Sequence, residues 1–223
     1  SNRGITHRSL RHANLFFSDE TRANVVLGDF VSTSAGFDQP VVYETIERGM
    51  ADEGGRGTGV LEDDMYAFGV TIAFMSQNQL PIDINSKEEI IISKLEKSTF
   101  QAIVGKEVIT PKVLDIMRGL LIDDPANRWG FEEVLNWKNG LPNKPSASSI
   151  SHKAHRPIEF GGFNHLYPRT LAHSMALRPE ESIESIKNGT IERWIVKDFM
   201  DGTLTPSFPS VLEEAKSQSE RTK

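Results

Sequence analysis

The sequence contains no cysteine among its 223 residues. Disulfide bonds and thiolate metal sites are therefore excluded, and nothing in the composition suggests a secreted, disulfide-stabilised fold. Runs of lysine or arginine are missing too, and 25 basic residues face 31 acidic ones, for a formal net charge of −6. Because proteins that bind nucleic acids usually carry a basic patch, this charge argues against a nucleic-acid partner.

Long apolar segments are also lacking. The longest mostly apolar stretch covers residues 66–75, whereas a helix that crosses a bilayer needs roughly 20 residues. We interpret this stretch as a buried core helix, and we expect no membrane partner and no signal peptide. Together these absences favour a soluble, cytoplasmic and mostly helical protein.

Composition divides the chain into four parts. Residues 1–140 carry regular hydrophobic patterns and form the first domain. Residues 141–158 are expected to be a linker, because they begin with a segment rich in proline and serine, LPNKPSASSIS. Residues 159–205 are expected to form a helical extension, and residues 206–223 a polar tail that frays.

Hydrophobic periodicity predicts the elements of these parts. Two short β-like runs lie between turn residues, at 24–27 and 39–43. From Asp63 onward the apolar spacing is helical, and four residues are expected to share one face: Met65, Phe68, Ile72 and Met75. Further helices are predicted at 87–95, from Thr110-Pro111, at 131–137, 169–177, 179–187 and 191–199. The fold class is thus mainly α with a little β.

Two short segments near the N-terminus have the residue types that phosphoryl transfer requires. The chain reads HRSLRHAN at residues 7–14 and DFV at residues 29–31. Protein kinases use H-R-D-x-x-x-x-N followed by D-F-G, in which one Asp orients the acceptor hydroxyl and the Asn and second Asp hold Mg²⁺. The spacing here resembles that of the eukaryotic-type serine/threonine protein kinases, and specifically that of their C-terminal lobe.

Three later segments resemble kinase motifs in the same order. Residues 43–47 (YETIE) are similar to Y-x-A-P-E, residues 64–69 (DMYAFG) to D-x-W-S-x-G, and residues 124–128 (DPANR) to D-P-x-x-R. The resemblance covers about residues 4–137 and implies a kinase-like C-lobe. It also implies structural roles for Glu47, Asp64 and Arg128, with Glu47 and Arg128 as a partly buried ion pair.

The first loop departs from the family at the position that carries proton chemistry. Ser9 lies where the family has its catalytic Asp, and a neutral hydroxyl cannot serve as a carboxylate base. Arg11 replaces the usual Lys, although its guanidinium could still contact a γ-phosphate with a different geometry. Val31 replaces the glycine of D-F-G and removes its easy access to positive φ. The resemblance therefore suggests a pseudokinase.

The remaining loop residues are kept. Asn14 and Asp29 occupy the two metal-ligand positions, and their oxygens suit Mg²⁺, so residual binding of ATP with magnesium is expected from the resemblance. His7 and Arg8 are expected to brace the loop, Arg8 against the segment that follows residues 29–31. The alternatives are that Asn14 only caps local backbone and that Asp29 persists as a hydrogen-bonding hub without metal.

A complete kinase also needs a Gly-rich loop and a strand lysine with its helix glutamate, and the sequence contains no segment that matches these. We therefore expect a second chain or fragment to supply the N-lobe and the preceding C-lobe helices. The main expectation is a regulatory or scaffolding pseudokinase module, part of a larger kinase-fold protein. A weak or atypical serine/threonine kinase is the alternative, since phosphoryl transfer depends mostly on positioning. A further alternative is a protein-binding helical module after residue 159, although its apolar residues could instead dock onto the lobe.

Overall fold

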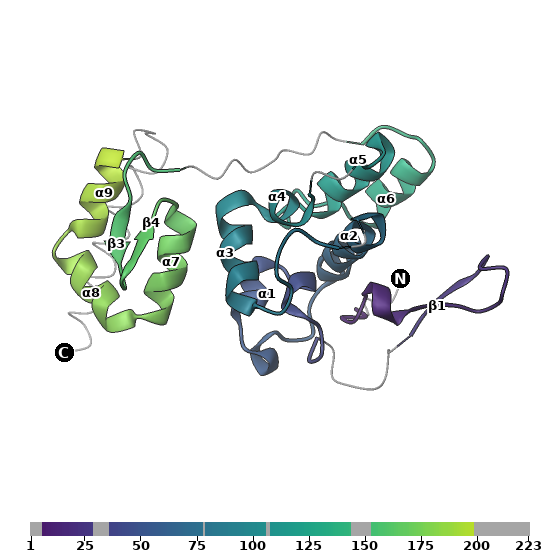
Figure 1. The fold of residues 1–223 in the computed structure, drawn as a ribbon, viewed down its shortest axis with the longest axis horizontal. Helices are drawn as coiled ribbons and strands as arrows, with labels where there is room; N and C mark the ends of the chain where they lie inside the picture. Colours follow the sequence, from purple (N-terminus) through teal and green to yellow (C-terminus); the bar gives the residue numbers. More distant parts are fainter. Residues whose placement is uncertain (1–5, 29–35, 78, 106–107, 144–152, 199–223) are drawn as a thin grey trace. The chain divides into compact units, whose positions relative to one another are not determined.

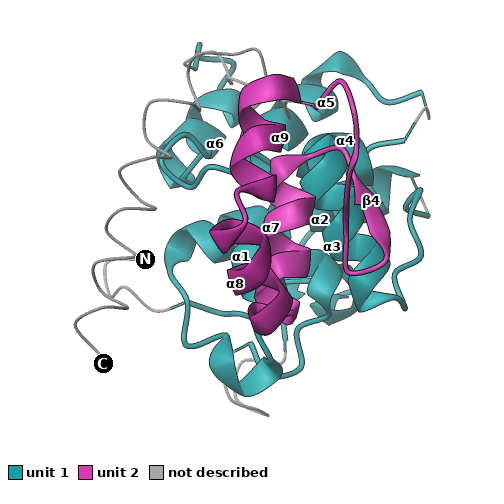
Figure 2. Ribbon diagram, turned by 90° about the vertical axis from the view of Figure 1, so that its left-hand side faces the viewer, with its two compact units in different colours: residues 1–150 teal, residues 151–223 magenta. Residues whose placement is uncertain are grey.

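The computed structural model of the chain describes residues 6–28, 36–77, 79–105, 108–143 and 153–198. It divides into two compact units, residues 1–150 and 151–223, which are coloured separately in Figure 2. Within the described ranges the chain is mainly helical and has two small antiparallel sheets (Figure 1). This confirms the expected class, mainly α with a little β.

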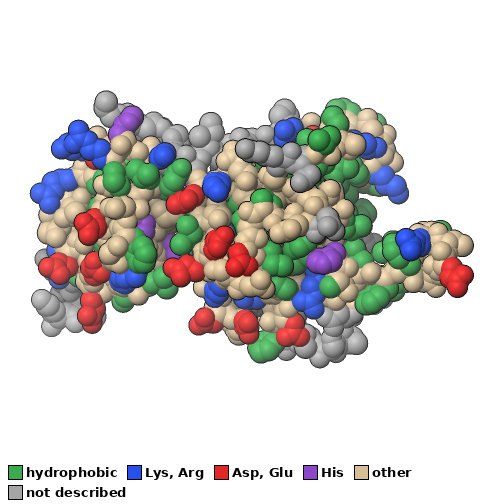
Figure 3. Space-filling model, viewed as in Figure 1, with side chains coloured by type: hydrophobic (Ala, Val, Ile, Leu, Met, Phe, Trp, Pro, Cys, Tyr) green, Lys and Arg blue, Asp and Glu red, His purple; other side chains and the backbone are tan. Residues whose placement is uncertain are grey.

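The first unit begins with a hairpin that projects beside its helices (Figure 1). Strand β1 (Leu15–Phe17) pairs antiparallel with β2 (Val25–Leu27), so that Phe16 faces Val26 and Phe17 faces Val25. These four side chains are 50–58 % exposed, and hydrophobic surface is visible on the hairpin in Figure 3. The predicted run at 24–27 is confirmed, whereas its partner β1 was not predicted.

The second β-like run was predicted wrongly. Residues Val41–Tyr43 form a 3-10 helix rather than a strand. Pro40 precedes it and has no N–H to give to a sheet ladder. The apolar side chains that suggested a strand instead enter the core, where Val42 and Tyr43 are almost completely buried.

The helices of the first unit follow the predicted order, with two short additions. The predicted ones are α2 (Leu61–Gln77), α3 (Lys87–Lys97), α5 (Pro111–Leu120) and α6 (Phe131–Lys138). The additions are α1 (Ile46–Met50) and α4 (Thr99–Ile103), each too short for periodicity to reveal. Two further 3-10 turns lie at His12–Asn14 and Glu53–Gly55.

Helix α2 is the core of the first unit, as the apolar stretch at 66–75 predicted. Tyr66 and Val70 are completely buried, and a Cβ on Gly69 would lie 2.8 Å from Leu120 Cβ, so glycine permits the close approach of α5. The predicted apolar face was wrong in part, because Met75 is 68 % exposed. The other three members, Met65, Phe68 and Ile72, are half-buried and pack from α2 against a cluster of Ile116, Leu120 and Trp129.

The second unit has its own sheet, helices and core. A hairpin of β3 (Ile158–Phe160) and β4 (Phe163–His165) precedes α7 (Pro168–Leu177), α8 (Pro179–Lys187) and α9 (Thr190–Asp198). The three helices match the predicted ones within one residue at each end. Its core joins the hairpin to the helices through Ala154, Ile158, Phe160, Leu171, Ile191, Trp194 and Ile195.

The hairpin of the second unit shows where the predicted linker differs from the structure. Ala154 and Ile158 lie in the core of this unit, although both fall inside the linker proposed at 141–158. Gly161 and Gly162 join the strands, and both have positive φ, at 61° and 80°. A two-residue Gly-Gly connection between apolar residues is a hairpin signal, so this element could have been predicted.

Candidate functional site

The loop that resembles a kinase catalytic loop is anchored by the first turns of α2. The carboxylate of Asp64 accepts hydrogen bonds from the backbone N–H of His7, at 2.6 Å, and of Arg8, at 2.8 Å. Arg8 has a positive φ of 59°, a conformation that costs a non-glycine residue roughly 1–2 kcal/mol. The charged hydrogen bonds to Asp64 hold this backbone in place, so Asp64 positions the loop over a sequence separation of 56 residues.

Within the loop, Ser9 and Asn14 are joined directly. The Asn14 amide nitrogen donates to the Ser9 carbonyl oxygen at 2.8 Å and to the Ser9 hydroxyl oxygen at 2.9 Å. Both side chains are buried. The Ser9 backbone N–H in turn donates to His7 Nδ1 at 3.2 Å, so His7 contributes both its backbone and its ring to the loop. Ser9 is thus hydrogen-bonded within the loop, and its side chain is a hydroxyl at the position where the resemblance leads us to expect an aspartate.

The side chain of Arg8 forms a buried ion pair that the sequence did not predict. Its Nη2 lies 2.9 Å from both carboxylate oxygens of Glu44, and the two side chains are 2 % and 0 % exposed. Burial raises the pKa of the Glu44 carboxyl, against the opposing effect of Arg8. Arg8 thus connects the loop to the segment before α1, and a neighbouring carboxylate of α2, Asp63, lies 3.9 Å from its Nη1.

The expected ion pair between Glu47 and Arg128 is not formed. In the described part of the chain no ion pair within 4.0 Å joins them, and Glu47 is exposed on the first turn of α1. The guanidinium of Arg128 is buried and donates to three backbone carbonyls, those of Ile122, Glu62 and Asp123. Burial lowers the pKa of Arg128. Arg128 therefore braces the chain after α5 against the start of α2 through backbone carbonyls.

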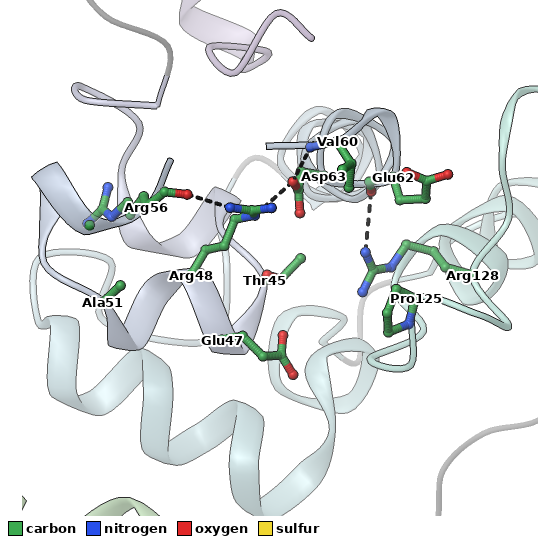
Figure 4. Close-up of a pocket in the computed structure, with 11 residues that line it drawn as sticks. Thr45, Glu47, Arg48, Ala51, Arg56, Val60, Glu62, Asp63, Pro125 and Arg128 are labelled. Carbon is green, nitrogen blue, oxygen red and sulfur yellow. Dashed lines mark hydrogen bonds and ion pairs between the residues drawn. The ribbon is translucent and has the colours of Figure 1, made fainter. Parts of the chain in front are cut away.

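Glu47 and Arg128 nevertheless line one pocket of about 510 Å³ (Figure 4). Arg48 and Arg128 approach it from opposite sides with Thr45 between them. Arg48 is held there by Asp63, whose Oδ2 lies 2.8 Å from Arg48 Nε, and it also donates to the Arg56 carbonyl oxygen. Arg48 is thus paired with a carboxylate of the same unit, whereas Arg128 donates to backbone carbonyls.

The remaining loop residues contact the segment before α1. Arg11 Nη1 donates to the Asp38 carbonyl oxygen at 2.7 Å. His12 stacks on Phe74 of α2 with ring centroids 4.7 Å apart, and its Nδ1 lies 2.7 Å from the Tyr43 hydroxyl. The Arg11 side chain thus binds the backbone of the same segment that carries Glu44, the partner of Arg8.

A buried lysine completes this region. Lys94 of α3 is 1 % exposed, and its Nζ donates to the carbonyl oxygens of Val41, Val42 and Glu44 at 2.8–3.3 Å. Burial lowers its pKa to about 7. The spacing of Ile90, Ile91 and Leu95 places Lys94 on their buried helix face, which is the signal that could have revealed it. Glu44 lies in the same YETIE motif as Glu47, so the sequence offered it as a second candidate for the acid of an ion pair.

Of the two expected Mg²⁺ ligands, Asn14 and Asp29, the structure describes only Asn14. Asp29 lies outside the described residues, as do Phe30 and Val31. Asn14 uses its amide nitrogen on Ser9, so its amide oxygen is the atom that could approach a cation. Within the described ranges, no group of three or more His, Asp or Glu side chains could hold a metal ion. Magnesium binding by Asn14 and Asp29 therefore stays a prediction.

Comparison with models of known protein families finds no match to the chain, and comparison with curated protein sequences finds none either. Among the helices that the structure describes, none is long and apolar enough to cross a membrane.

Proposed function

We propose that the chain is a pseudokinase module: a kinase-like C-lobe, part of a larger protein, that acts as a scaffold or regulator rather than as an efficient phosphotransferase. The observation that carries the proposal is Ser9. Its hydroxyl occupies the position of the expected catalytic Asp and accepts a hydrogen bond from Asn14. A neutral hydroxyl cannot accept a proton at neutral pH as a carboxylate does.

The order of the rest of the loop supports this proposal. Three residues at positions that resemble kinase positions are joined here: the Asp64 carboxylate accepts hydrogen bonds from the backbone N–H groups of His7 and Arg8. A loop that is well anchored but has a hydroxyl in place of its acid suits binding and scaffolding better than proton transfer. The same buried loop makes residual binding of ATP with magnesium part of the proposal, with Asn14 Oδ1 and Asp29 as the Mg²⁺ ligands.

We further propose that a second chain or fragment supplies an N-lobe and the helices that precede this lobe. The exposed hairpin supports this part, because Phe16 and Val26 lie on one face and Phe17 and Val25 on the other. A two-stranded hairpin with apolar side chains on both faces is marginally stable in water by itself. Contact with another polypeptide would cover these side chains.

The test is a Mg²⁺-dependent titration of the intact parent protein with a fluorescent ATP analogue, together with a phosphotransfer assay. We expect saturable binding that is lost in Asp29→Ala, and no phosphate transfer. The matched control is Asp38→Ala, which changes an exposed carboxylate of the same unit. Phosphate incorporation that disappears in Asp29→Ala would instead identify an atypical serine/threonine kinase, and the absence of saturable binding at millimolar nucleotide would exclude the roles of Asn14 and Asp29.

The second unit supports another candidate function, a protein-binding module. It has a core of its own that joins a hairpin to three helices. This core favours an independent unit over a tail whose apolar residues dock onto the first unit. Deleting residues 151–223 separates the possibilities. A soluble first unit that loses a binding partner favours the module, whereas an insoluble first unit indicates that the second one stabilises it.

A further inference from the structure

One segment of the first unit, residues 38–44, is held from outside by basic side chains. Arg11 donates to the Asp38 carbonyl, and Arg56 donates to the Gln39 carbonyl, each at 2.7 Å. Lys94 donates to three further carbonyls, those of Val41, Val42 and Glu44. Arg8 holds the Glu44 carboxylate at 2.9 Å. We call residues 38–44 the strap.

The four basic side chains come from different parts of the unit. Arg8 and Arg11 belong to the loop before β1, Arg56 to the connection between α1 and α2, and Lys94 to α3. The strap therefore ties these parts together, although its own internal backbone bonds are few: the Tyr43 N–H donates to Pro40 and the Glu44 N–H to Val41. Its order depends on side chains that reach it from elsewhere.

The strap has two carboxylates: Asp38 is exposed, whereas Glu44 is buried against Arg8. The space around the Arg8 guanidinium is narrow. A Cβ on Gly36 would lie 2.7 Å from Arg8 Nη2, and one on Gly59 would lie 2.5 Å from Arg8 Cδ. Two glycines thus enclose the guanidinium. Segments of this kind in other proteins can be ordered by phosphorylation, which adds a negative charge that an arginine can bind. Here Glu44 already supplies that charge.

We propose that the strap is a constitutive latch: the Glu44 carboxylate orders residues 38–44 through Arg8 without any added phosphate. Loss of that carboxylate opens the strap locally. The proposal concerns order rather than catalysis, and it stands whether or not the lobe binds nucleotide.

The electrostatic consequence of losing Glu44 follows from the contacts. Among the described residues, Asp63 also lies near the Arg8 guanidinium, at 3.9 Å, but it lies closer to Arg48, at 2.8 Å. Without the Glu44 charge, two arginines would share one aspartate in a buried site. Removing one partner of a buried ion pair is strongly destabilising for this reason. The charged side chains that act on the Glu44 carboxyl are Arg8, Arg56 and Asp63, and Lys94 donates to the Glu44 carbonyl oxygen.

The experiment is hydrogen exchange, read by mass spectrometry at neutral pH, on the full chain after phosphatase treatment. The reporters are the amides of Tyr43 and Glu44, compared with amides of α5. In the unmodified wild type we expect slow exchange at both reporters. Glu44→Gln keeps the side-chain size and removes the charge, and it should raise exchange at the reporters on the order of a hundredfold. Exchange in α5 should rise much less.

The matched control is Glu47→Gln, which neutralises an exposed carboxylate three residues away and should leave the reporters unchanged. If Glu44→Gln fails to fold, Arg11→Gln removes the exposed anchor at Asp38 and should speed exchange several-fold in the strap alone. Fast exchange in the phosphatase-treated wild type would overturn the proposal. So would equal exchange in the Glu44 and Glu47 variants, or strap opening that always coincides with the unfolding of α5.

Discussion

Replacing Asp64 by asparagine tests how the loop is held. In the native chain both carboxylate oxygens of Asp64 accept backbone N–H groups, from His7 at 2.6 Å and from Arg8 at 2.8 Å. Asparagine has one acceptor oxygen, so its amide nitrogen would face one of the two N–H donors. One buried donor then loses its partner, and the other loses a charged acceptor.

The expected magnitude follows from these two losses. An unsatisfied buried donor costs roughly 1–3 kcal/mol, and a hydrogen bond to a charged group contributes about 1 kcal/mol more than one to a neutral group. The positive φ of Arg8 adds strain that Asp64 no longer opposes. We therefore expect Asp64→Asn to destabilise the loop by about 2–4 kcal/mol.

Hydrogen exchange can measure this loss at the loop itself. The Asn14 N–H donates to the Arg11 carbonyl, and the Gly28 N–H donates to the Asn14 carbonyl, so both amides report loop opening. A loss of about 2–4 kcal/mol corresponds to between one and three powers of ten in exchange rate. The control is Asp115→Asn, which changes an exposed aspartate of α5 and should alter these amides little. A change below threefold in Asp64→Asn would refute the argument that Asp64 holds the loop.

Two further predictions concern the core around the strap. The pKa of Lys94 in the folded chain is about 7 against an ordinary value of 10.5, so between these values the unfolded chain binds the proton and the folded chain does not. The free energy of unfolding should therefore rise with pH across this window, by roughly 1 kcal/mol per pH unit at most. Lys94→Met should abolish this rise, and urea titrations of both proteins from pH 6.5 to 10 measure it. An equal dependence of the unfolding free energy on pH in the two proteins would contradict the prediction. Gly69→Ala should destabilise the first unit by about 1–3 kcal/mol through overpacking against Leu120. Thermal unfolding measures the loss, with Gly54→Ala as control because no described atom lies within 4 Å of a Cβ there; similar melting temperatures for the two variants would show that α2 and α5 can separate without cost.

Sequence periodicity was sufficient for most of the helices and insufficient for the contacts between them. The three helices after residue 168 and the start of α5 at Pro111 follow from apolar spacing and from proline at the first helical position. These signals are local, because a helix satisfies its backbone hydrogen bonds within a few residues. The Gly161-Gly162 connection between β3 and β4 is an equally local signal.

Partner choice among charged side chains was beyond the sequence. Glu44 and Glu47 lie in the same short motif, and the sequence favoured Glu47 as the acid of an ion pair. The structure instead turns Glu44 inward to Arg8 and leaves Glu47 exposed. The difference depends on one 3-10 turn, Val41–Tyr43, and on the position of α3 beneath it. Neither is encoded by spacing within the motif.

The sequence by itself determined the class of the fold, the places of the longer helices and the identity of Ser9 at the position expected for an acid. These depend on residue type and on local spacing, which a sequence states directly. The tertiary structure decided which groups meet: Asp64 with the backbone of His7 and Arg8, Arg8 with Glu44, and Lys94 with three carbonyls of the strap. The contacts of Arg8, His7 and Lys94 join residues that are 36 to 57 positions apart in the sequence. They arise because burying charged groups is tolerated only where the packed helices bring a partner to each one.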